Sequence, residues 1–318
     1  MSEKKVSRNV AFVLGFICII LAISLVVETG FYYLPEISSL NSQIDSLRSQ
    51  IDDMRVVEVT SFVQGAVDYA KTNGKDIALK EFSKNSSSKF IKGELYIFAI
   101  DFNGVTLAQP YRPQDIGYSH LDLKDPNEVL FFKNMLNTAK RGNGTLYYVW
   151  PNPAHDNAFE TKLTYVEKVD DTWWIGSGIY LSDVLVTFSE TSRSELVSFV
   201  DSAVRYAQEN GKDKALEAFN DKSGDFFKES LYLFGCDFQG NQLLAPQQPE
   251  VVGTNRLDLV DPNGVKMVQD LVDAAEDGGG FTYYVYEDPT ANMKQRLKLS
   301  YVLKVDDTWW IGAGLYAL

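Results

Sequence analysis

The sequence is poor in the residues that build metal centres, disulfide frameworks and nucleic-acid surfaces. Its 318 residues include only two cysteines and two histidines, too few to indicate a zinc site or a set of disulfides. We therefore expect no metal and no cofactor. Acidic residues outnumber basic ones by 43 to 30, for a net charge of −13. This excess of carboxylates disfavours a nucleic-acid partner.

Long apolar runs are also rare, with one exception near the N-terminus. Three basic residues among the first eight precede an unbroken apolar run of eighteen residues, 10–27. A helix of that length spans about 27 Å, close to the hydrocarbon thickness of a bilayer. The pattern predicts a cytoplasmic N-terminus (1–9), a single-pass anchor in the cell membrane with its interface (10–34), and an extracytoplasmic remainder. A cleaved signal peptide is the alternative.

Residues 35–54 show a heptad pattern. Apolar residues recur at alternating intervals of three and four, at Ile37, Leu40, Ile44, Leu47, Ile51 and Met54. Isoleucine at a and leucine or methionine at d favour a parallel two-stranded coiled coil. We therefore expect a coiled-coil stalk and a parallel homodimer, because a shared membrane also concentrates two tethered copies. An amphipathic helix packed on its own domain is the alternative.

The rest of the sequence is an internal duplication. The segment VDDTWWIGSGIY at 169–180 returns as VDDTWWIGAGLY at 305–316, and LYIFAIDFNG returns as LYLFGCDFQG at the same spacing of 136 residues. This period is too long for a solenoid unit and has the length of a domain. We therefore expect two tandem domains of like fold, at 55–180 and 193–318, joined by a linker over 181–192.

Each copy predicts helices followed by an antiparallel sheet. A long amphipathic helix comes first, at about 36–72 and again at about 193–210. Asp125 and Asp261, each followed by proline, predict the N-cap of a later helix. Three strands close each copy, and a Val-Asp-Asp-Thr turn joins the last two. This order of elements indicates an α+β fold.

The repeated strand after that turn presents different residues to its two faces, because side chains alternate along a strand. Trp173 and Ile175 point to one face, and Trp174, Gly176 and Gly178 point to the other. Glycine weakens a strand unless another group approaches closely. We therefore expect either a tightly packed helix or a ligand against the glycine face.

The order of the motifs is similar to that of the single Cache domain of type two, which is found outside the membrane in prokaryotic chemoreceptors and sensor kinases. The resemblance is carried by LYIFAIDFNG, LDLKDPNEV, YYVWPNP, KLTYVEKV and DDTWWIGSGIY, and it covers nearly all of both copies. It implies a PAS-like fold in which a long N-terminal helix packs on a curved antiparallel sheet that holds a small ligand. It also implies a sensor of small molecules, often carboxylates, and no enzymatic activity.

The resemblance further implies which residues form the ligand pockets. The matching aromatic and lysine residues are Tyr96, Tyr148, Trp150, Lys162 and Tyr165 in the first copy, and Tyr232, Tyr284, Tyr286, Lys298 and Tyr301 in the second. A buried lysine needs an anionic partner, so we expect Lys162 to bind a carboxylate. A solvated lysine at the start of a strand is the alternative, and for each tyrosine the alternative is core packing.

The sequence departs from the family pattern at one position in each copy. A histidine usually precedes the proline after the second strand, but Gln109 stands there in the first copy and Ala245 in the second. In addition, Trp150 of the first copy is replaced by Tyr286 in the second. We therefore expect the two pockets to differ in ligand, with Gln109 among the binding residues and the first copy as the better candidate.

These patterns predict a membrane-tethered sensor. About nine residues precede the apolar run and no kinase, methyl-accepting or cyclase segment follows it, so we expect signalling through an unidentified membrane signalling or transport partner. A structural surface protein with the repeats as spacers is one alternative. A hydrolase that uses the paired aspartates Asp170, Asp171, Asp306 and Asp307 is another, although aspartate in such turns commonly forms local backbone hydrogen bonds.

Overall fold

The computed structural model describes residues 33–85, 87–181, 187–228 and 230–317. The chain divides into two units, Met1–Met54 and Arg55–Leu318. The predicted membrane anchor at 10–34 lies almost wholly outside the described residues. Within the described ranges, no helix is both long enough and apolar enough to span a bilayer.

Helix α2 (Leu34–Asn73) begins in the first unit and ends in the second. Its heptad residues Ile37, Leu40 and Ile44 are about half exposed in the single chain, and the coiled coil stays a prediction. In the second unit, the apolar side of α2 joins the buried core through Val59, Val63, Ala66, Val67 and Ala70.

We call residues 55–181 repeat one and residues 187–317 repeat two. After α2, repeat one contains α3 (Lys75–Phe82), β1 (Ile91–Lys92), β2 (Leu95–Tyr96), β3 (Phe98–Asp101), β4 (Thr106–Ala108), η2 (Pro113–Asp115), α4 (Phe131–Lys140), β5 (Asn143–Asn152), β6 (Ala158–Asp170) and β7 (Trp173–Leu181). Repeat two contains α5 (Glu190–Asn210), α6 (Lys212–Asn220), β8 (Phe234–Asp237), β9 (Gln242–Leu244), η3 (Pro249–Val251), α7 (Met267–Glu276), β10 (Gly280–Asp288), η4 (Pro289–Ala291), β11 (Lys294–Asp306) and β12 (Trp309–Tyr316).

The two repeats contain five-stranded antiparallel sheets of the same topology. The strand order is β4-β3-β7-β6-β5 in repeat one and β9-β8-β12-β11-β10 in repeat two. Position for position along the chain, these are the same connections. The α+β fold is therefore as expected, and the Val-Asp-Asp-Thr segment turns between the last two strands of each sheet. The domain boundaries and the linker at 181–192 stay predictions.

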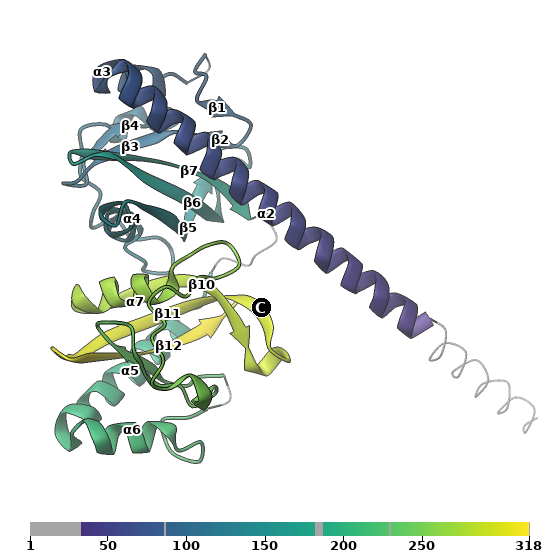
Figure 1. Ribbon diagram of the computed structural model, residues 1–318, viewed down its shortest axis with the longest axis vertical. Helices are drawn as coiled ribbons and strands as arrows, with labels where there is room; N and C mark the ends of the chain where they lie inside the picture. The colour runs from purple at the N-terminus through teal and green to yellow at the C-terminus, as the bar shows by residue number, and fades with distance from the viewer. Residues whose placement is uncertain (1–32, 86, 182–186, 229, 318) are drawn as a thin grey trace, which may run out of the picture. The chain divides into compact units, whose positions relative to one another are not determined.

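Each sheet is covered on two faces by different helices. In repeat two, α5 packs on β11 and β12 from one side and α7 packs on β10 and β11 from the other, as Figure 1 shows. The two adjacent tryptophans separate between these layers, as the alternation predicts. Trp309 lies in the cluster that contains the buried face of α5, and Trp310 lies in the cluster that contains α7.

The prediction that Asp125 and Asp261 cap a helix is wrong. Helix α4 begins at Phe131, and α7 begins at Met267. The Oδ1 atom of Asp125 instead accepts the backbone N–H groups of residues 127 and 129. This closes a tight loop, and Glu128 inside it has a φ of 69°, outside the helical region. The aspartate therefore holds a loop, and the helix starts only after it.

The second glycine of the repeated strand makes room for a lysine. A Cβ atom added to Gly314 would lie 2.5 Å from Cε of Lys298 and 2.5 Å from Oγ of Ser300. In repeat one, a Cβ on Gly178 would lie 2.9 Å from Cε of Lys162. The neighbouring strand therefore approaches this glycine, through the lysine stem and through the side chain of Ser300 or Thr164, and the expectation of a helix or a ligand there is corrected.

This contact predicts that Gly314→Ala destabilises the fold. The added methyl group would overlap the Lys298 stem, and overpacking of this kind costs about 1–3 kcal/mol. The matched control is Gly65→Ala on an exposed part of α2, where nothing lies within 4 Å of the added Cβ. The control should be stabilised by up to about 1 kcal/mol. Urea unfolding measures both, and an unchanged Gly314→Ala variant would contradict the contact.

Candidate functional site

Each repeat has a cavity on the face of its sheet that carries α4 or α7. The cavity of repeat two, here cavity two, has a volume of about 70 Å³. The cavity of repeat one, here cavity one, has a volume of about 20 Å³. Because both sheets have the same topology, the difference comes from the side chains that line them.

Three parts of repeat two form the walls of cavity two. The sheet and the segment before it contribute Tyr232, Phe234, Cys236, Tyr284, Tyr286, Lys298 and Trp310. Helix α7 contributes an apolar wall of Met267, Val268 and Leu271. The loop between β9 and α7 contributes Gln247, Gln248 and Arg256. The cavity is therefore apolar on one side, and the charged residues of its lining are Lys298, Arg256 and Glu287.

Lys298 is the most unusual group in cavity two, because its side chain is only 2% exposed. Its Nζ atom donates a hydrogen bond to the hydroxyl of Tyr232 at 3.2 Å and lies 4.8 Å from the ring centre of Tyr316. It forms no ion pair with any residue in the described part of the chain. Burial lowers the pKa of Lys298 to about 7, and the charge of Asp288 only partly opposes this. The ammonium therefore lacks an anionic partner.

The sheet register explains why this lysine is held so far from water. Lys298 on β11 lies opposite Tyr284 on β10 and opposite Tyr316 on β12. Hydrogen bonds then fix the hydroxyl groups around it. The hydroxyls of Tyr232 and Tyr316 are 2.8 Å apart, and Tyr316 donates to the carbonyl oxygen of Glu287 at 2.7 Å. The polar end of the cavity is thus organised before any ligand arrives.

A second polar group lies at the loop side of cavity two. The Tyr286 hydroxyl donates to Oε1 of Gln248 at 2.7 Å, and Nε2 of Gln248 donates to the Glu287 carboxylate at 3.1 Å. Arg256 adds a cation to the same lining. A small molecule with one anionic group and one apolar part matches this distribution of charge and apolar surface.

Repeat one has the equivalent lysine, but this lysine does not line cavity one, which has little space. Lys162 is fully buried, and its Nζ donates to the Tyr96 hydroxyl at 2.9 Å. The ring of Phe131 from α4 stacks on Tyr148 with centroids 4.8 Å apart and contacts Trp150 edge-on. These aromatic rings occupy the volume that the smaller residues of α7 leave open in cavity two.

The structure brings most of the predicted site residues together. Tyr96, Gln109, Tyr148 and Trp150 line cavity one, with Lys162 bonded to Tyr96. Tyr232, Tyr284, Tyr286 and Lys298 line cavity two. Both lysines are buried, so the alternative of a solvated strand start is excluded.

The predictions for Tyr165 and Tyr301 are wrong. Each stands three residues after its lysine, and an odd spacing along a strand places two side chains on opposite faces. The Tyr165 hydroxyl donates to Glu167 at 2.9 Å. Tyr301 packs on Phe281 and belongs to the cluster on the α5 side of the sheet. Neither tyrosine lines the cavity of its repeat.

Sequence reasoning missed the residues that distinguish the two cavities. Val268 and Leu271 come from α7, and Gln248 and Arg256 come from a loop outside the repeated motifs. A signal for the loop residues was present at the spacing of 136, because Gln248 stands where repeat one has Arg112. Positions at which the two otherwise matching copies have different residues indicate where the linings of the two cavities differ.

The paired aspartates form local turns. The Asp170 carboxylate accepts hydrogen bonds from N and Oγ1 of Thr172 at 2.7 Å each and from Nε1 of Trp173 at 3.0 Å. Burial raises the pKa of Asp170, but these hydrogen bonds outweigh burial and lower it overall. Asp306 has the equivalent partners. In the described ranges, no group of three or more His, Cys, Asp or Glu residues could hold a metal ion.

Comparison with known proteins identifies the family. A family model described as a Cache domain matches residues 36–317, and the chain therefore belongs to the Cache domain family. Over 93 residues the chain is 37% identical to the sensor histidine kinase MctS of Rhizobium johnstonii. That match covers 29% of this chain and 20% of the kinase, so the chain spans about a fifth of the length of this curated relative.

Solved structures of related domains are also similar. A methyl-accepting chemotaxis protein from Vibrio parahaemolyticus is 28% identical with a TM-score of 0.36, covering 40% of this chain and 89% of that one. A Cache chemosensory domain described for carboxylic acid recognition is 23% identical with a TM-score of 0.31, covering 46% of this chain and 98% of that one.

The burial of Lys298 predicts a pH dependence of stability. The folded chain releases the proton of Lys298 near pH 7, whereas the unfolded chain retains it up to about pH 10.4. The unfolded state therefore binds more protons between these values, and the folded state gains stability as the pH rises. The free energy of unfolding of the wild type, relative to Lys298→Met, should increase from pH 7 to pH 9.5 in urea titrations. A constant difference between the two proteins would show that folding does not lower the pKa of Lys298.

Proposed function

We propose that this protein is the ligand-binding part of an extracytoplasmic sensor and that it binds a small organic carboxylate in cavity two. One observation carries the proposal. The Lys298 ammonium is buried against a cavity and has no anionic partner among the described residues. A buried charge without a partner is costly, and a bound carboxylate would supply the missing charge.

The surrounding donors favour a carboxylate over a neutral ligand. The hydroxyl of Tyr232 lies at hydrogen-bond distance from Lys298. Trp310 lines the same cavity, and its Nε1–H has no acceptor in the part of the chain that the structure describes. Hydrogen bonds to a charged group contribute about 1.5–3 kcal/mol each, more than those to a neutral group. A neutral ligand would leave the ammonium unpaired.

Cavity two is the proposed site in place of the first copy, which the sequence favoured through Gln109. Gln109 does line cavity one, and its Oε1 has no hydrogen-bond partner within the described chain. The volume there is only about 20 Å³, however, because Phe131 and Trp150 fill it. The larger volume of cavity two therefore favours it over cavity one as the ligand site.

Calorimetric titration with sodium acetate, propionate, butyrate and hexanoate at pH 6.5 tests the proposal. At least one acid should bind, and at 100 times its dissociation constant it should stabilise the protein by about 2.7 kcal/mol. Lys298→Met removes the charge and keeps the apolar stem, so affinity should fall roughly 10- to 150-fold. The matched control, Lys162→Met, removes the equivalent buried charge from repeat one and should leave the affinity unchanged.

The two lysine variants also distinguish the cavities. Loss of binding in Lys162→Met alone would assign the ligand to cavity one. Equal binding of the uncharged amides, such as propionamide and butyramide, would contradict a site built around an ammonium. If none of the acids stabilises the protein, the carboxylate proposal is wrong.

We also propose that the binding domain is anchored outside the cytoplasm by the apolar run at 10–27. The support is the sequence pattern of basic residues followed by eighteen apolar ones. Membership of the Cache family agrees with an extracytoplasmic sensor. The signalling or transport partner stays a prediction.

The heptad residues of α2 predict a parallel homodimer. Leu40 and Ile44 are 51% and 46% exposed in the single chain, and pairing would remove both from water. Sedimentation of the protein at micromolar concentration should show a dimer, and Leu40→Glu combined with Ile44→Glu should shift it to a monomer. Ile77→Glu, at an isoleucine that is 56% exposed on α3, is the matched control and should remain dimeric. A wild-type monomer would contradict the coiled coil.

A further inference from the structure

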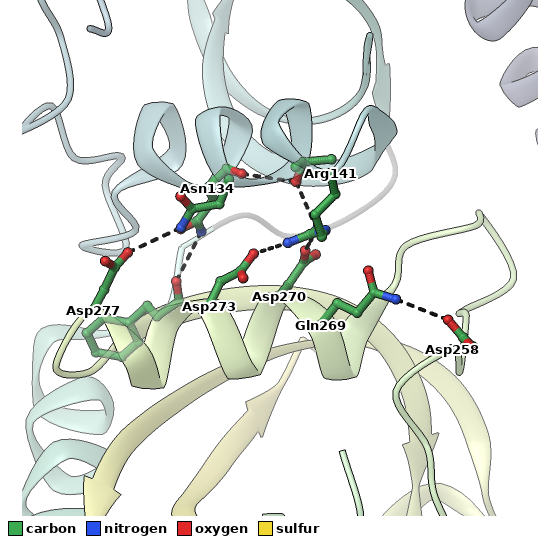
Figure 2. A network of polar contacts seen from close by, with 10 residues as sticks. Asn134, Arg141, Asp258, Gln269, Asp270, Asp273 and Asp277 are labelled. Carbon is green, nitrogen blue, oxygen red and sulfur yellow. Dashed lines mark hydrogen bonds and ion pairs between the residues drawn. The ribbon is translucent and has the colours of Figure 1, made fainter. Parts of the chain in front are cut away.

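Helix α7 connects cavity two with repeat one. Val268 and Leu271 line the cavity, whereas Asp270 and Asp273 form ion pairs with Arg141 at the end of α4. Figure 2 shows Arg141 extending from repeat one to these two aspartates. One helix therefore presents an apolar face to the cavity and an acidic face to repeat one.

Arg141 provides the charge that Asp270 needs. The side chain of Asp270 is 7% exposed, and its Oδ1 lies 2.5 Å from Nη2 of Arg141. Burial raises the pKa of Asp270 to about 6, although Arg141 opposes the rise. At pH 7.5 the carboxylate is ionised, and without Arg141 it would be a buried charge lacking this partner. Removing one member of a buried ion pair is far more damaging than losing an exposed pair.

Repeat one also forms hydrogen bonds with β10, the strand that contributes another wall of cavity two. Tyr283 on β10 donates its hydroxyl proton to Oδ2 of Asp125 at 2.9 Å and accepts a hydrogen bond from Asn127 at 2.7 Å. The next residue, Tyr284, points to the opposite face of the strand and lines the cavity. Strand β10 and helix α7 are thus both attached to repeat one beside the residues that face the ligand space.

The contact between the repeats is reciprocal in part. Asn263 of repeat two donates to the Tyr147 hydroxyl of repeat one at 2.6 Å, which mirrors the contact of Asn127 with Tyr283. At the spacing of 136, the position equivalent to Arg141 is Asp277. The cation therefore reaches from repeat one to α7, and no equivalent arginine reaches from α7 back to α4.

We propose that Arg141 of repeat one is a positioning residue for cavity two, which it keeps narrow by holding the acidic face of α7. This inference rests on the proposed binding of a carboxylate in cavity two. Without Arg141, the buried carboxylate of Asp270 would need water as its partner. Helix α7 would then move away from the cavity so that water could reach this carboxylate. Val268 and Leu271 would move with it. The space for the apolar part of the ligand would then grow, while Lys298 on β11 would remain in place.

The chain-length preference of carboxylate binding tests this role. Calorimetric titration with sodium acetate, propionate, butyrate and hexanoate gives the ratio of hexanoate to acetate affinity for each variant. In Arg141→Gln this ratio should rise about fourfold, the factor expected for one additional buried methylene group. A loss of stability alone would lower the apparent affinity for all four acids by the same factor, and the ratio would not move.

Two further variants provide the control and the rescue. Lys133→Gln removes the ion pair between Lys133 of α4 and Asp277 at the end of α7. The side chains of both residues are 36% exposed. This variant should leave the ratio unchanged. Asp270→Asn removes the charge that needs hydration, so its combination with Arg141→Gln should return the ratio towards that of the wild type. An unchanged ratio in Arg141→Gln, or an equal change in Lys133→Gln, would overturn the proposal.

A measurement without any ligand separates this proposal from the proposed function. Cys236 lines cavity two and is 2% exposed, so its labelling by N-ethylmaleimide reports access to the cavity. Peptide mass spectrometry of the labelled full chain distinguishes it from Cys18. Arg141→Gln should speed the labelling of Cys236 at least about fivefold over Lys133→Gln, the factor for about 1 kcal/mol in an opening equilibrium.

The dependence of this labelling on urea identifies its cause. Opening of the cavity alone exposes little surface, so the labelling rate should respond weakly to low urea, whereas labelling through global unfolding rises steeply. Faster labelling with weak urea dependence supports the role of Arg141, even if none of the four acids binds and the proposed function fails. Labelling at the rate of Lys133→Gln would overturn it.

Discussion

A charged ammonium group held beneath a β-sheet is the constraint on which each repeat depends. The stem of Lys298 needs a neighbour without a side chain, and Gly314 provides it. Its charged end needs polar contacts within reach, and the hydroxyl of Tyr232 provides one. The pairing of β11 with β12 sets Lys298 opposite Tyr316 and Ser300 opposite Gly314, so the sheet register determines where the lysine stem lies. The strand sequence that places glycine two residues before a tyrosine follows from this requirement.

The two repeats show how one scaffold gives two different interiors. Lys162 and Lys298 are equivalent and both buried, so the polar part of the site persists in each. The helix across from the lysine has changed. In repeat one it contributes Phe131, which stacks on Tyr148, and in repeat two it contributes the smaller Met267 and Val268. Lys298 lines cavity two, whereas Lys162 does not line cavity one, so the proposed binding role depends on packing as much as on the charged residue.

Much of the fold was readable from the sequence, because the signals were local and occurred twice. The alternation along the strand predicts that Trp173 and Trp174 point to opposite faces of the sheet, and the spacing of 136 residues predicts a repeated topology. An Asp-Pro pair fits a helix N-cap and a closed loop equally well, and the partners that hold Asp125 in the loop include Val149 and Tyr283 from later strands. The resemblance implies a pocket role for Tyr165, but its spacing of three residues from Lys162 places it on the opposite face of β6, and it does not line cavity one. The size of each cavity depends on how the side chains of α4 or α7 pack against the sheet, and no local sequence pattern encodes that packing.

The interface between the repeats combines contacts that both copies make with contacts that only one copy makes. The reciprocal contacts of Tyr283 with Asn127 and of Tyr147 with Asn263 use the same loop in both copies, so they tie the repeats together without distinguishing them. Arg141 breaks this equivalence, because its counterpart at the same spacing is an aspartate. A cation on one helix and carboxylates on the other attract only in the observed pairing, since two copies of either helix would place like charges together. The charge difference thus selects the contact between unlike repeats, and it also places a buried carboxylate directly behind the apolar wall of the larger cavity.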